Sequence, residues 1–245
     1  YDVIDLKYIH NRDGFLYYIA SPDNATQKYL YKTKLNGKGK NELLSPISLK
    51  GSHDYSFSSN GNYAEHTFSN HFTPNSKEFI SIANHKALTD KESILKNIKK
   101  LEEKPTTEFF TITTADNVEM DGPARATVND SYNTSRNSLY IGDMAEDGYI
   151  YISLDNRGTP SPKGREWRKS IYRKIGMINI NDQAMAAKEI LNWDFIDPER
   201  VAVWGWSGGG SATLNLMFQY PEIYKTGIAI AAVANQLTYD NIYQE

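Results

Sequence analysis

The feature that most constrains this chain is a glycine-flanked serine between an apolar strand and a helix. Val201-Ala202-Val203-Trp204 is apolar throughout, which is typical of a strand buried on both faces. It leads into Gly205-Trp206-Ser207-Gly208-Gly209, which matches G-x-S-x-G, and then into a helix-like segment over about 207–220. Glycines let the backbone close up at such a turn, while the serine oxygen stays exposed above the sheet. The sequence therefore predicts a nucleophile elbow with Ser207 as its nucleophile.

The residue after the serine is Gly208, and we expect its backbone amide to point at a developing oxyanion. The N-terminus of the following helix adds partial positive charge there. The alternative is a phosphate-binding loop, because Gly208-Gly209-Gly210-Ser211 also offers backbone amides. That segment lacks the Gly-Lys-Ser/Thr of a P-loop, and G-x-G-x-x-G is absent. The nucleophile elbow is the favoured interpretation.

The second half of the chain alternates strand-like and helix-like segments. In chain order they are the strand Gly148–Leu154, the helix Asp182–Trp193, the strand Val201–Trp204, the helix near 207–220 and the strand Thr226–Ala234. A turn at Asp197-Pro198 separates the first helix from the next strand. This alternation implies a parallel sheet with helices on its faces, so the second half is α/β.

Residues 1 to about 110 have a different texture, with short strand-like segments between turn formers. These segments are Gly14–Ala20, Tyr29–Leu35, Asp54–Phe57 and Tyr63–Phe68. They recur about every 10–15 residues, as strands do in four-stranded propeller blades, and the stretch would supply only about two blades. One short helix is expected over Asp90–Glu103, with Ile94, Leu95, Ile98 and Leu101 on a common face.

Composition excludes several classes of protein. The 245 residues include no cysteine, which excludes disulfide-rich, zinc-finger, iron–sulfur and thiol-nucleophile proteins. A net charge of −3 argues against a protein that coats nucleic acid. No apolar run approaches the roughly 18–20 residues that span a bilayer, so we expect no membrane span in this segment.

Two local patterns are weaker signals. Arg157–Lys174 is basic and contains Trp167 and Tyr172, a composition that can favour nucleic-acid contact, but we expect no nucleic-acid partner. His66 and His71 lie five residues apart without a carboxylate-rich partner set, so we expect no metal site there and no cofactor.

Several separate motifs, in the right order, resemble the prolyl oligopeptidase family (S9) of serine peptidases, and the dipeptidyl peptidase IV branch within it. They are Phe110-Thr111-Ile112-Thr113-Thr114-Ala115-Asp116, Asp155-Asn156-Arg157-Gly158-Thr159, Trp204-Gly205-Trp206-Ser207-Gly208-Gly209-Gly210 and Tyr239-Asp240-Asn241-Ile242-Tyr243-Gln244-Glu245. The resemblance implies the C-terminal part of a β-propeller over residues 1–110. It implies the N-terminal part of an α/β-hydrolase peptidase domain over residues 111–245.

The resemblance also implies a function and a site. Ser207 matches the nucleophile and Gly208 the oxyanion amide, while Val233, Tyr239 and Tyr243 match walls of the small apolar pocket that receives proline or alanine. The implied activity is a serine exopeptidase that releases N-terminal dipeptides after Pro or Ala through an acyl-enzyme. Its partners would be peptide substrates with Pro or Ala near the N-terminus. In the full-length form, the partner would be a second copy of the chain in a homodimer. The resemblance favours an extracytoplasmic location, periplasmic or secreted.

The partners that a serine nucleophile needs are missing from the expected places. A histidine must take the proton and a carboxylate must orient that histidine. All five histidines precede Ser207, and the one aspartate after it, Asp240, resembles a position beside the pocket. The chain stops about where the strands carrying both triad partners would begin. We therefore expect a chain that is incomplete and inactive as a peptidase on its own.

A second gap is expected near Asp121-Gly122-Pro123. The family places two further strands there, with the tyrosine that donates the second oxyanion hydrogen bond. The paired propeller glutamates that hold the substrate's amino terminus are also not in this segment, so dipeptide and tripeptide release both remain open. Two other functions stay as alternatives: a non-catalytic propeller-type binding protein with a decayed hydrolase half, and an α/β-hydrolase esterase.

Overall fold

The computed structural model describes residues 2–21, 25–70, 73–89, 93–97, 108–124 and 148–240. The chain divides into two compact units, which we describe separately. The first unit comprises Tyr1–Phe110, Gly122–Ser153 and Pro160–Glu166, and the second comprises Thr111–Asp121, Leu154–Thr159 and Trp167–Glu245.

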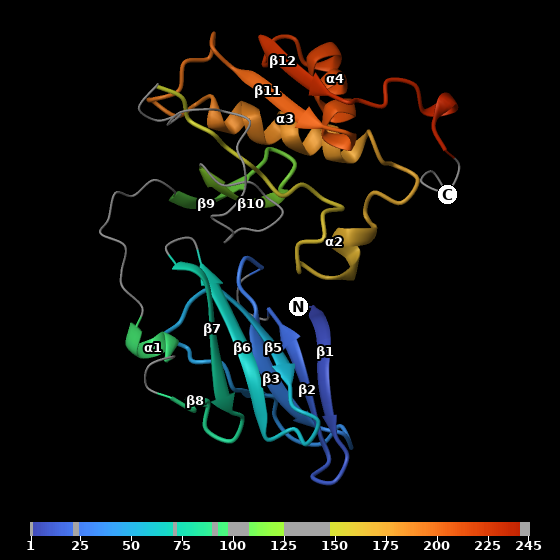
Figure 1. The fold of residues 1–245 in the computed structure, drawn as a ribbon. Helices are drawn as coiled ribbons and strands as arrows, with labels where there is room; N and C mark the ends of the chain where they lie inside the picture. Colours follow the sequence, from blue (N-terminus) through green and yellow to red (C-terminus); the bar gives the residue numbers. More distant parts are fainter. Residues whose placement is uncertain are drawn as a thin grey trace. The chain divides into compact units, whose positions relative to one another are not determined.

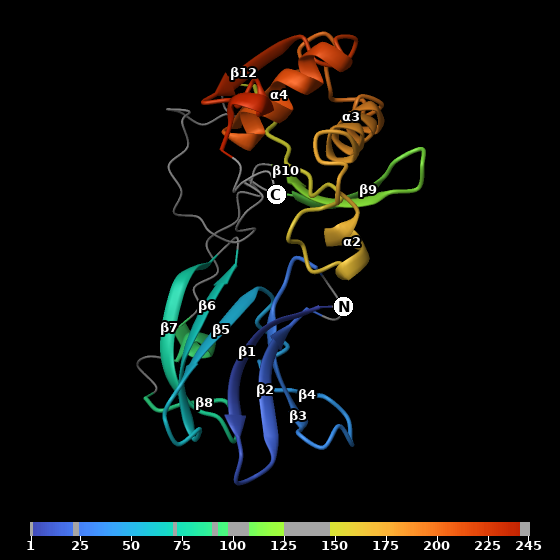
Figure 2. The same cartoon turned by 90° about the vertical axis from the view of Figure 1, so that its right-hand side faces the viewer.

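The first unit contains two four-stranded sheets, each an antiparallel meander in sequence order (Figures 1 and 2). The first sheet consists of β1 (Val3–His10), β2 (Phe15–Ala20), β3 (Tyr29–Lys34) and β4 (Glu42–Leu43). The second consists of β5 (Ser52–Phe57), β6 (Tyr63–Asn70), β7 (Thr73–Ser81) and β8 (Lys86–Ala87). Both have the four-stranded organisation of a propeller blade, so the expectation of about two propeller-like blades is confirmed.

Four of these strands carry little sequence signal. The strands β4 and β8 have only two residues each. The first four residues of β1 are all exposed, so buried and exposed positions do not alternate there. The strand β7 begins Thr73-Pro74-Asn75, of which proline and asparagine favour turns over strands. Pairing with neighbouring strands, which a short sequence window does not contain, makes these segments extended.

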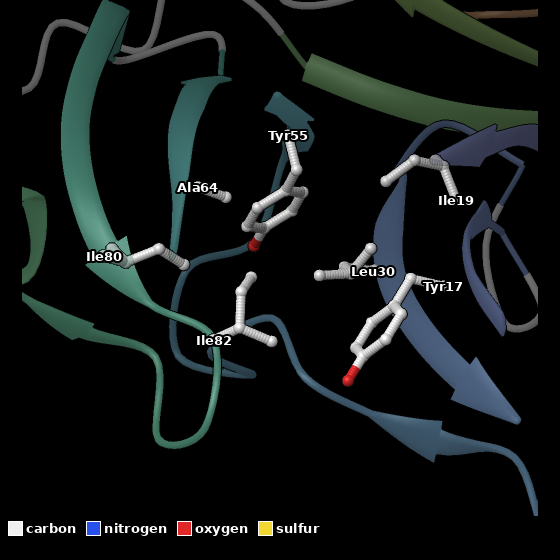
Figure 3. Close-up of a cluster of buried hydrophobic side chains, with 7 residues drawn as sticks. All are labelled: Tyr17, Ile19, Leu30, Tyr55, Ala64, Ile80 and Ile82. Atoms are coloured by element: carbon white, nitrogen blue, oxygen red, sulfur yellow. The ribbon is translucent and has the colours of Figure 1, made fainter. Parts of the chain in front are cut away.

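The core of the first unit lies between its two sheets. Seven buried residues form it: Tyr17, Ile19, Leu30, Tyr55, Ala64, Ile80 and Ile82 (Figure 3). Along β6, buried residues alternate with more exposed ones, which is the period-2 pattern of a strand with one packed face. A parallel bridge between Lys28 and Ser52 also joins the two sheets, and the ring of Tyr8 stacks on Phe57 at 5.2 Å between centroids.

The helix expected over Asp90–Glu103 is described only as α1 (Ile94–Asn97). Ile94 is buried against Leu49 and Phe68, whereas Leu95 is 48% exposed, so these two residues do not share a buried face. Ile98 and Leu101 lie outside the described residues.

A two-stranded sheet is formed by β9 (Glu108–Thr113) and β10 (Glu119–Ala124). The remaining elements are α2 (Arg165–Lys169), α3 (Ile178–Ile190), β11 (Ala202–Trp206), α4 (Gly208–Gln219), β12 (Thr226–Ile230) and the 3-10 helix η1 (Gln236–Thr238). The strands β11 and β12 pair in parallel, from Ala202 opposite Thr226 to Trp206 opposite Ile230. With α4 between them they form a β-α-β unit, which confirms the expected partial α/β hydrolase part (Figure 1).

Two expected element boundaries and one expected strand are wrong. The helix α3 begins at Ile178, four residues before the expected start, and β12 ends at Ile230 instead of Ala234. Residues 148–154 form no regular strand, and Ile152 is the one bridging residue among them. A regular strand needs a partner along its whole length, and no sheet formed by the described strands includes this segment.

The strand β11 is not buried on both faces. Val203 packs into a cluster with Leu216 of α4, but Trp204 and Trp206 on the opposite face are 40% and 59% exposed. Within the described residues, β11 pairs with β12 alone, so one face of the pair is covered by helix and the other is open. No helix among the described residues is long and apolar enough to cross a membrane.

Candidate active site

Ser207 lies at the turn between β11 and α4, in a backbone conformation that few non-glycine residues adopt. Its φ is 55° and its ψ is −117°. The Ser207 N–H donates to the carbonyl of Ile230 in β12 at 2.8 Å, and its own carbonyl accepts from the N–H of Ser211 at 3.0 Å. The turn is therefore held from the sheet on one side and from the helix on the other. This is the geometry of a nucleophile elbow.

The glycines around Ser207 have different steric roles. A Cβ on Gly205 would lie 2.3 Å from the carbonyl carbon and oxygen of Gly209, so strand and helix approach too closely for any side chain. A Cβ on Gly210 would lie 2.8 Å from the carbonyl oxygen of Ile230. A Cβ on Gly208, by contrast, meets nothing within 4 Å. Crowding thus requires glycine at position 205, two residues before Ser207, whereas a side chain at position 208, directly after Ser207, would enter open space.

The side chain of Ser207 is exposed, and its hydroxyl has no hydrogen-bond partner among the described residues. The second unit contains no histidine at all. His10, His53, His66 and His85 all belong to the first unit, and His71 lies outside the described residues. The unit that carries Ser207 therefore holds no imidazole that could serve as its base.

Ser211, in the first turn of α4, connects the elbow to Val233. Its hydroxyl accepts a hydrogen bond from the Val233 N–H at 3.0 Å and donates one to the Val233 carbonyl at 2.9 Å. The Ser211 N–H also bonds to the Ser207 carbonyl, so one residue contacts both predicted site residues. Sequence reasoning missed this role. The pattern that could have predicted it is a serine four positions after the nucleophile, which lies one helical turn away.

The other predicted pocket residues are less completely described. Tyr239 is half-buried and follows η1, and its N–H bonds to the carbonyl of Gln236 at 3.2 Å. The Asn235 side chain caps η1 by accepting from the Leu237 N–H at 3.0 Å. Tyr243 lies outside the described residues.

The loop Asp155–Thr159 is anchored by a buried ion pair with α3. The Arg157 guanidinium donates to both carboxylate oxygens of Asp182, at 2.5–3.1 Å, and the Arg157 N–H adds a further bond at 2.9 Å. Asp182 is 1% exposed. Hydrogen bonding to Asp182 raises the pKa of Arg157 above its ordinary value. The other buried residues of α3 are apolar, so Asp182 depends on this pairing for its charge.

Neighbouring contacts hold the same loop. The Gln183 side chain donates to the Leu154 carbonyl at 2.9 Å and to the Asn156 side chain at 3.0 Å. Gly158 has a φ of 92°, and a Cβ there would lie 2.4 Å from the Ile171 side chain. The loop is therefore fixed by α3 and by close packing.

A strained serine on a strand–helix turn beside parallel strands is the arrangement of the α/β-hydrolase fold, and here it follows propeller-like antiparallel sheets in the same chain. Comparison with known families agrees. The model of the prolyl oligopeptidase family matches residues 135–245, and that of the dipeptidyl peptidase IV N-terminal region matches residues 1–75. The chain belongs to the prolyl oligopeptidase family of serine peptidases and is dipeptidyl peptidase IV-like.

Individual relatives show the same similarity. A probable dipeptidyl-aminopeptidase B from Neurospora crassa is 28% identical over an alignment of 276 positions. The alignment covers 100% of this chain and 29% of the relative. One from Pyrenophora teres f. teres is 29% identical, with 99% and 28% covered. The crystal structure of Porphyromonas gingivalis dipeptidyl peptidase 4 matches with a TM-score of 0.78 and 27% identity, over 99% of this chain and 37% of that one. The chain thus spans less than a third of the length of the two dipeptidyl-aminopeptidase B relatives.

Proposed function

We propose that this chain is part of a dipeptidyl peptidase IV-like exopeptidase that releases N-terminal dipeptides after proline or alanine. The observation that carries the proposal is the backbone of Ser207, strained at φ 55° between β11 and α4. Such strain persists only where the surrounding structure maintains it, and it clusters at active sites. Family membership supports a peptidase over other serine hydrolases.

In the proposed reaction, the Ser207 oxygen attacks the carbonyl after the second residue of the peptide. The tetrahedral oxyanion receives a hydrogen bond from the Gly208 N–H at the start of α4, where the helix dipole adds positive potential. Collapse of this intermediate releases the shortened peptide amine and leaves the dipeptide esterified to Ser207. Water then hydrolyses the ester and frees the dipeptide.

Substrate choice is assigned to the residues beyond β12. Val233, Tyr239 and Tyr243 would form the walls of a small apolar pocket that accepts the proline ring or an alanine methyl. The Ser211 hydroxyl supports this assignment, because it fixes the backbone of Val233 relative to the elbow. Peptides with Pro or Ala at the second position are therefore the proposed substrates, and we place the boundary between the propeller and hydrolase parts near residues 110 and 111.

A general base is a requirement that the second unit does not meet by itself, because it contains no histidine. Removing triad members leaves roughly 10³–10⁴-fold catalysis over the uncatalysed reaction. We therefore propose that the 245-residue chain alone has negligible peptidase activity. Turnover would need a histidine and a carboxylate from further polypeptide, consistent with the share of the relatives that this chain spans.

The test is to extend the chain with the hydrolase region that follows the matched segment in its relatives. Hydrolysis of Gly-Pro and Ala-Pro p-nitroanilides is then compared with that of Gly-Leu p-nitroanilide, for the extended wild type and its Ser207→Ala variant. We expect release from the proline substrates that Ser207→Ala abolishes. Equal turnover with and without the Ser207 hydroxyl would contradict the proposal.

The lack of a histidine in the second unit favours one other function, a non-catalytic propeller-type binding protein with a decayed hydrolase half. A fluorophosphonate probe discriminates between the two in the extended chain, because it labels only an activated serine. Labelling that disappears in Ser207→Ala supports the peptidase. An extended chain that folds and stays unlabelled supports the binding protein.

A further inference from the structure

The first unit contains a buried cluster of polar side chains that has no part in the chemistry of Ser207. His66 on β6, Glu78 on β7 and His85 in the β7–β8 turn each offer a ligand atom, and these atoms lie within 4.8 Å of one another. His66 is 0% and Glu78 is 3% exposed. Buried polar groups such as His66 and Glu78 are costly unless each is paired or holds a metal.

The contacts of the His66 ring show which of its two nitrogens faces Glu78. Nε2 of His53 lies 2.8 Å from the carbonyl of Leu49, which can only accept, so this nitrogen of His53 carries a hydrogen. Nδ1 of His53 lies 2.9 Å from Nε2 of His66, so Nε2 of His66 is engaged in this contact. That leaves Nδ1 of His66 facing Oε1 of Glu78, at 2.8 Å.

Glu78 and His85 each also have a hydrogen-bond partner outside the cluster. Oε2 of Glu78 accepts from the Ile94 N–H at 2.9 Å. Nε2 of His85 lies 2.7 Å from the hydroxyl of Tyr55, which in turn lies 2.8 Å from the Ser45 hydroxyl. Nδ1 of His85 is buried, and among the described residues it has no hydrogen-bond partner outside its own residue. A buried ring nitrogen of this kind needs a partner, and a metal ion would supply one.

We propose that His66, Glu78 and His85 bind one divalent transition-metal ion, with Zn²⁺ as the best fit. Two imidazoles and one carboxylate form a donor set that zinc prefers, whereas Ca²⁺ and Mg²⁺ prefer oxygen ligands alone. Each of the three ligands has an outer partner that orients it, as ligands of protein metal sites regularly do. The cation takes the place of the proton shared by Nδ1 of His66 and Oε1 of Glu78, and that proton passes to solvent.

The site joins β6, β7 and the β7–β8 turn, so its role is structural. Bound metal stabilises the second sheet of the first unit, β5 to β8. His85 is the most exposed of the three residues. The pair His66 and His71, considered from their spacing, is not the ligand set. Strand pairing and the β7–β8 turn bring together residues that are far from His66 in the sequence.

The experiment uses the full chain, free of any affinity tag and of metal, titrated with Zn²⁺ by calorimetry. The test variant is His85→Asn, because asparagine tolerates the left-handed backbone of His85 at φ 50° and has no ring nitrogen. The control is His10→Asn, which removes another histidine of the first unit that pairs with Asp13 outside the cluster. Circular dichroism establishes that each variant is folded.

We expect one Zn²⁺ per wild-type chain, an affinity lower by at least about tenfold in His85→Asn, and wild-type binding in His10→Asn. X-ray absorption of the zinc-loaded wild type should show two imidazole ligands, which needs no variant. Absence of stoichiometric binding to the wild type, unchanged affinity in His85→Asn, or a zinc environment with fewer than two imidazoles would overturn the proposal. None of these measurements depends on the peptidase activity of Ser207.

Discussion

The hydroxyl of Ser211 bonds to both backbone polar groups of Val233, accepting from its N–H at 3.0 Å and donating to its carbonyl at 2.9 Å. Because the Ser211 N–H also bonds to the Ser207 carbonyl, the nucleophile turn and the proposed pocket wall are joined through one residue. The segment after β12 therefore takes its position from α4.

Ser211→Ala tests this connection. Loss of the hydroxyl leaves the N–H and carbonyl of Val233 without their partner, so we expect the second unit to lose about 1–3 kcal/mol of unfolding free energy. Urea unfolding followed by tryptophan fluorescence measures it, because all four tryptophans lie in the second unit. Glu199→Ala, an exposed change in the same unit, is the control and should stay within about 0.5 kcal/mol. Equal stability of the two variants would show that Ser211 does not hold Val233.

Gly205→Ala and Gly208→Ala form a matched pair on the two sides of Ser207. The new methyl at Gly205 would overlap the backbone of Gly209 at 2.3 Å, so we expect a loss of about 3 kcal/mol or more. The methyl at Gly208 enters open space in the first turn of α4, where alanine is about 0.5–1 kcal/mol better than glycine. Urea midpoints of both variants check this. Similar losses in both would mean that the close approach of β11 and α4 is wrong.

How far the sequence predicts this fold depends on where the determining contacts lie. The elbow was predictable because Gly205, Ser207 and the adjoining helix are neighbours in sequence and their spacing reflects local sterics. The strand β7 was not, because its turn-like start becomes extended only through pairing with β6. Trp204 was expected to be buried from its apolar neighbours, but the opposite face of β11 lacks a cover among the described residues.

The same reasoning applies to the polar sites. The ion pair of Arg157 with Asp182 joins residues 25 positions apart, and no local pattern indicates which carboxylate the arginine of that loop selects. The cluster of His66, Glu78 and His85 likewise arises from strand register, since Glu78 lies directly opposite His66 in the β6–β7 pair. Spacing within one segment set His66 beside His71 alone, and no metal site was expected from that pair.

Arg157→Met tests the ion pair to Asp182. It leaves a carboxylate that is 1% exposed without its cation, and we expect a loss of about 3–5 kcal/mol in the unfolding free energy of the second unit. Arg157→Lys keeps the charge but loses the two-pronged contact, so its loss should be smaller.

The control for this pair is Lys188→Met. Lys188 pairs with Glu222 at 3.8 Å on the surface, and exposed pairs of this kind contribute about 0–1 kcal/mol. In urea unfolding we expect the largest loss in Arg157→Met, a smaller one in Arg157→Lys and the smallest in Lys188→Met. A loss in Arg157→Met no larger than in Lys188→Met would contradict the anchoring role of Asp182.

The most direct measurement of the central claim is covalent labelling by an Ala-Pro diphenyl phosphonate, which resembles the substrate and traps an activated serine. The chain extended with the hydrolase region is incubated with the probe, digested and analysed by mass spectrometry. We predict a single adduct on the peptide that contains Ser207, no adduct in Ser207→Ala, and protection by a Gly-Pro dipeptide. An extended chain that cleaves Gly-Pro p-nitroanilide while the adduct forms on another residue would contradict the account.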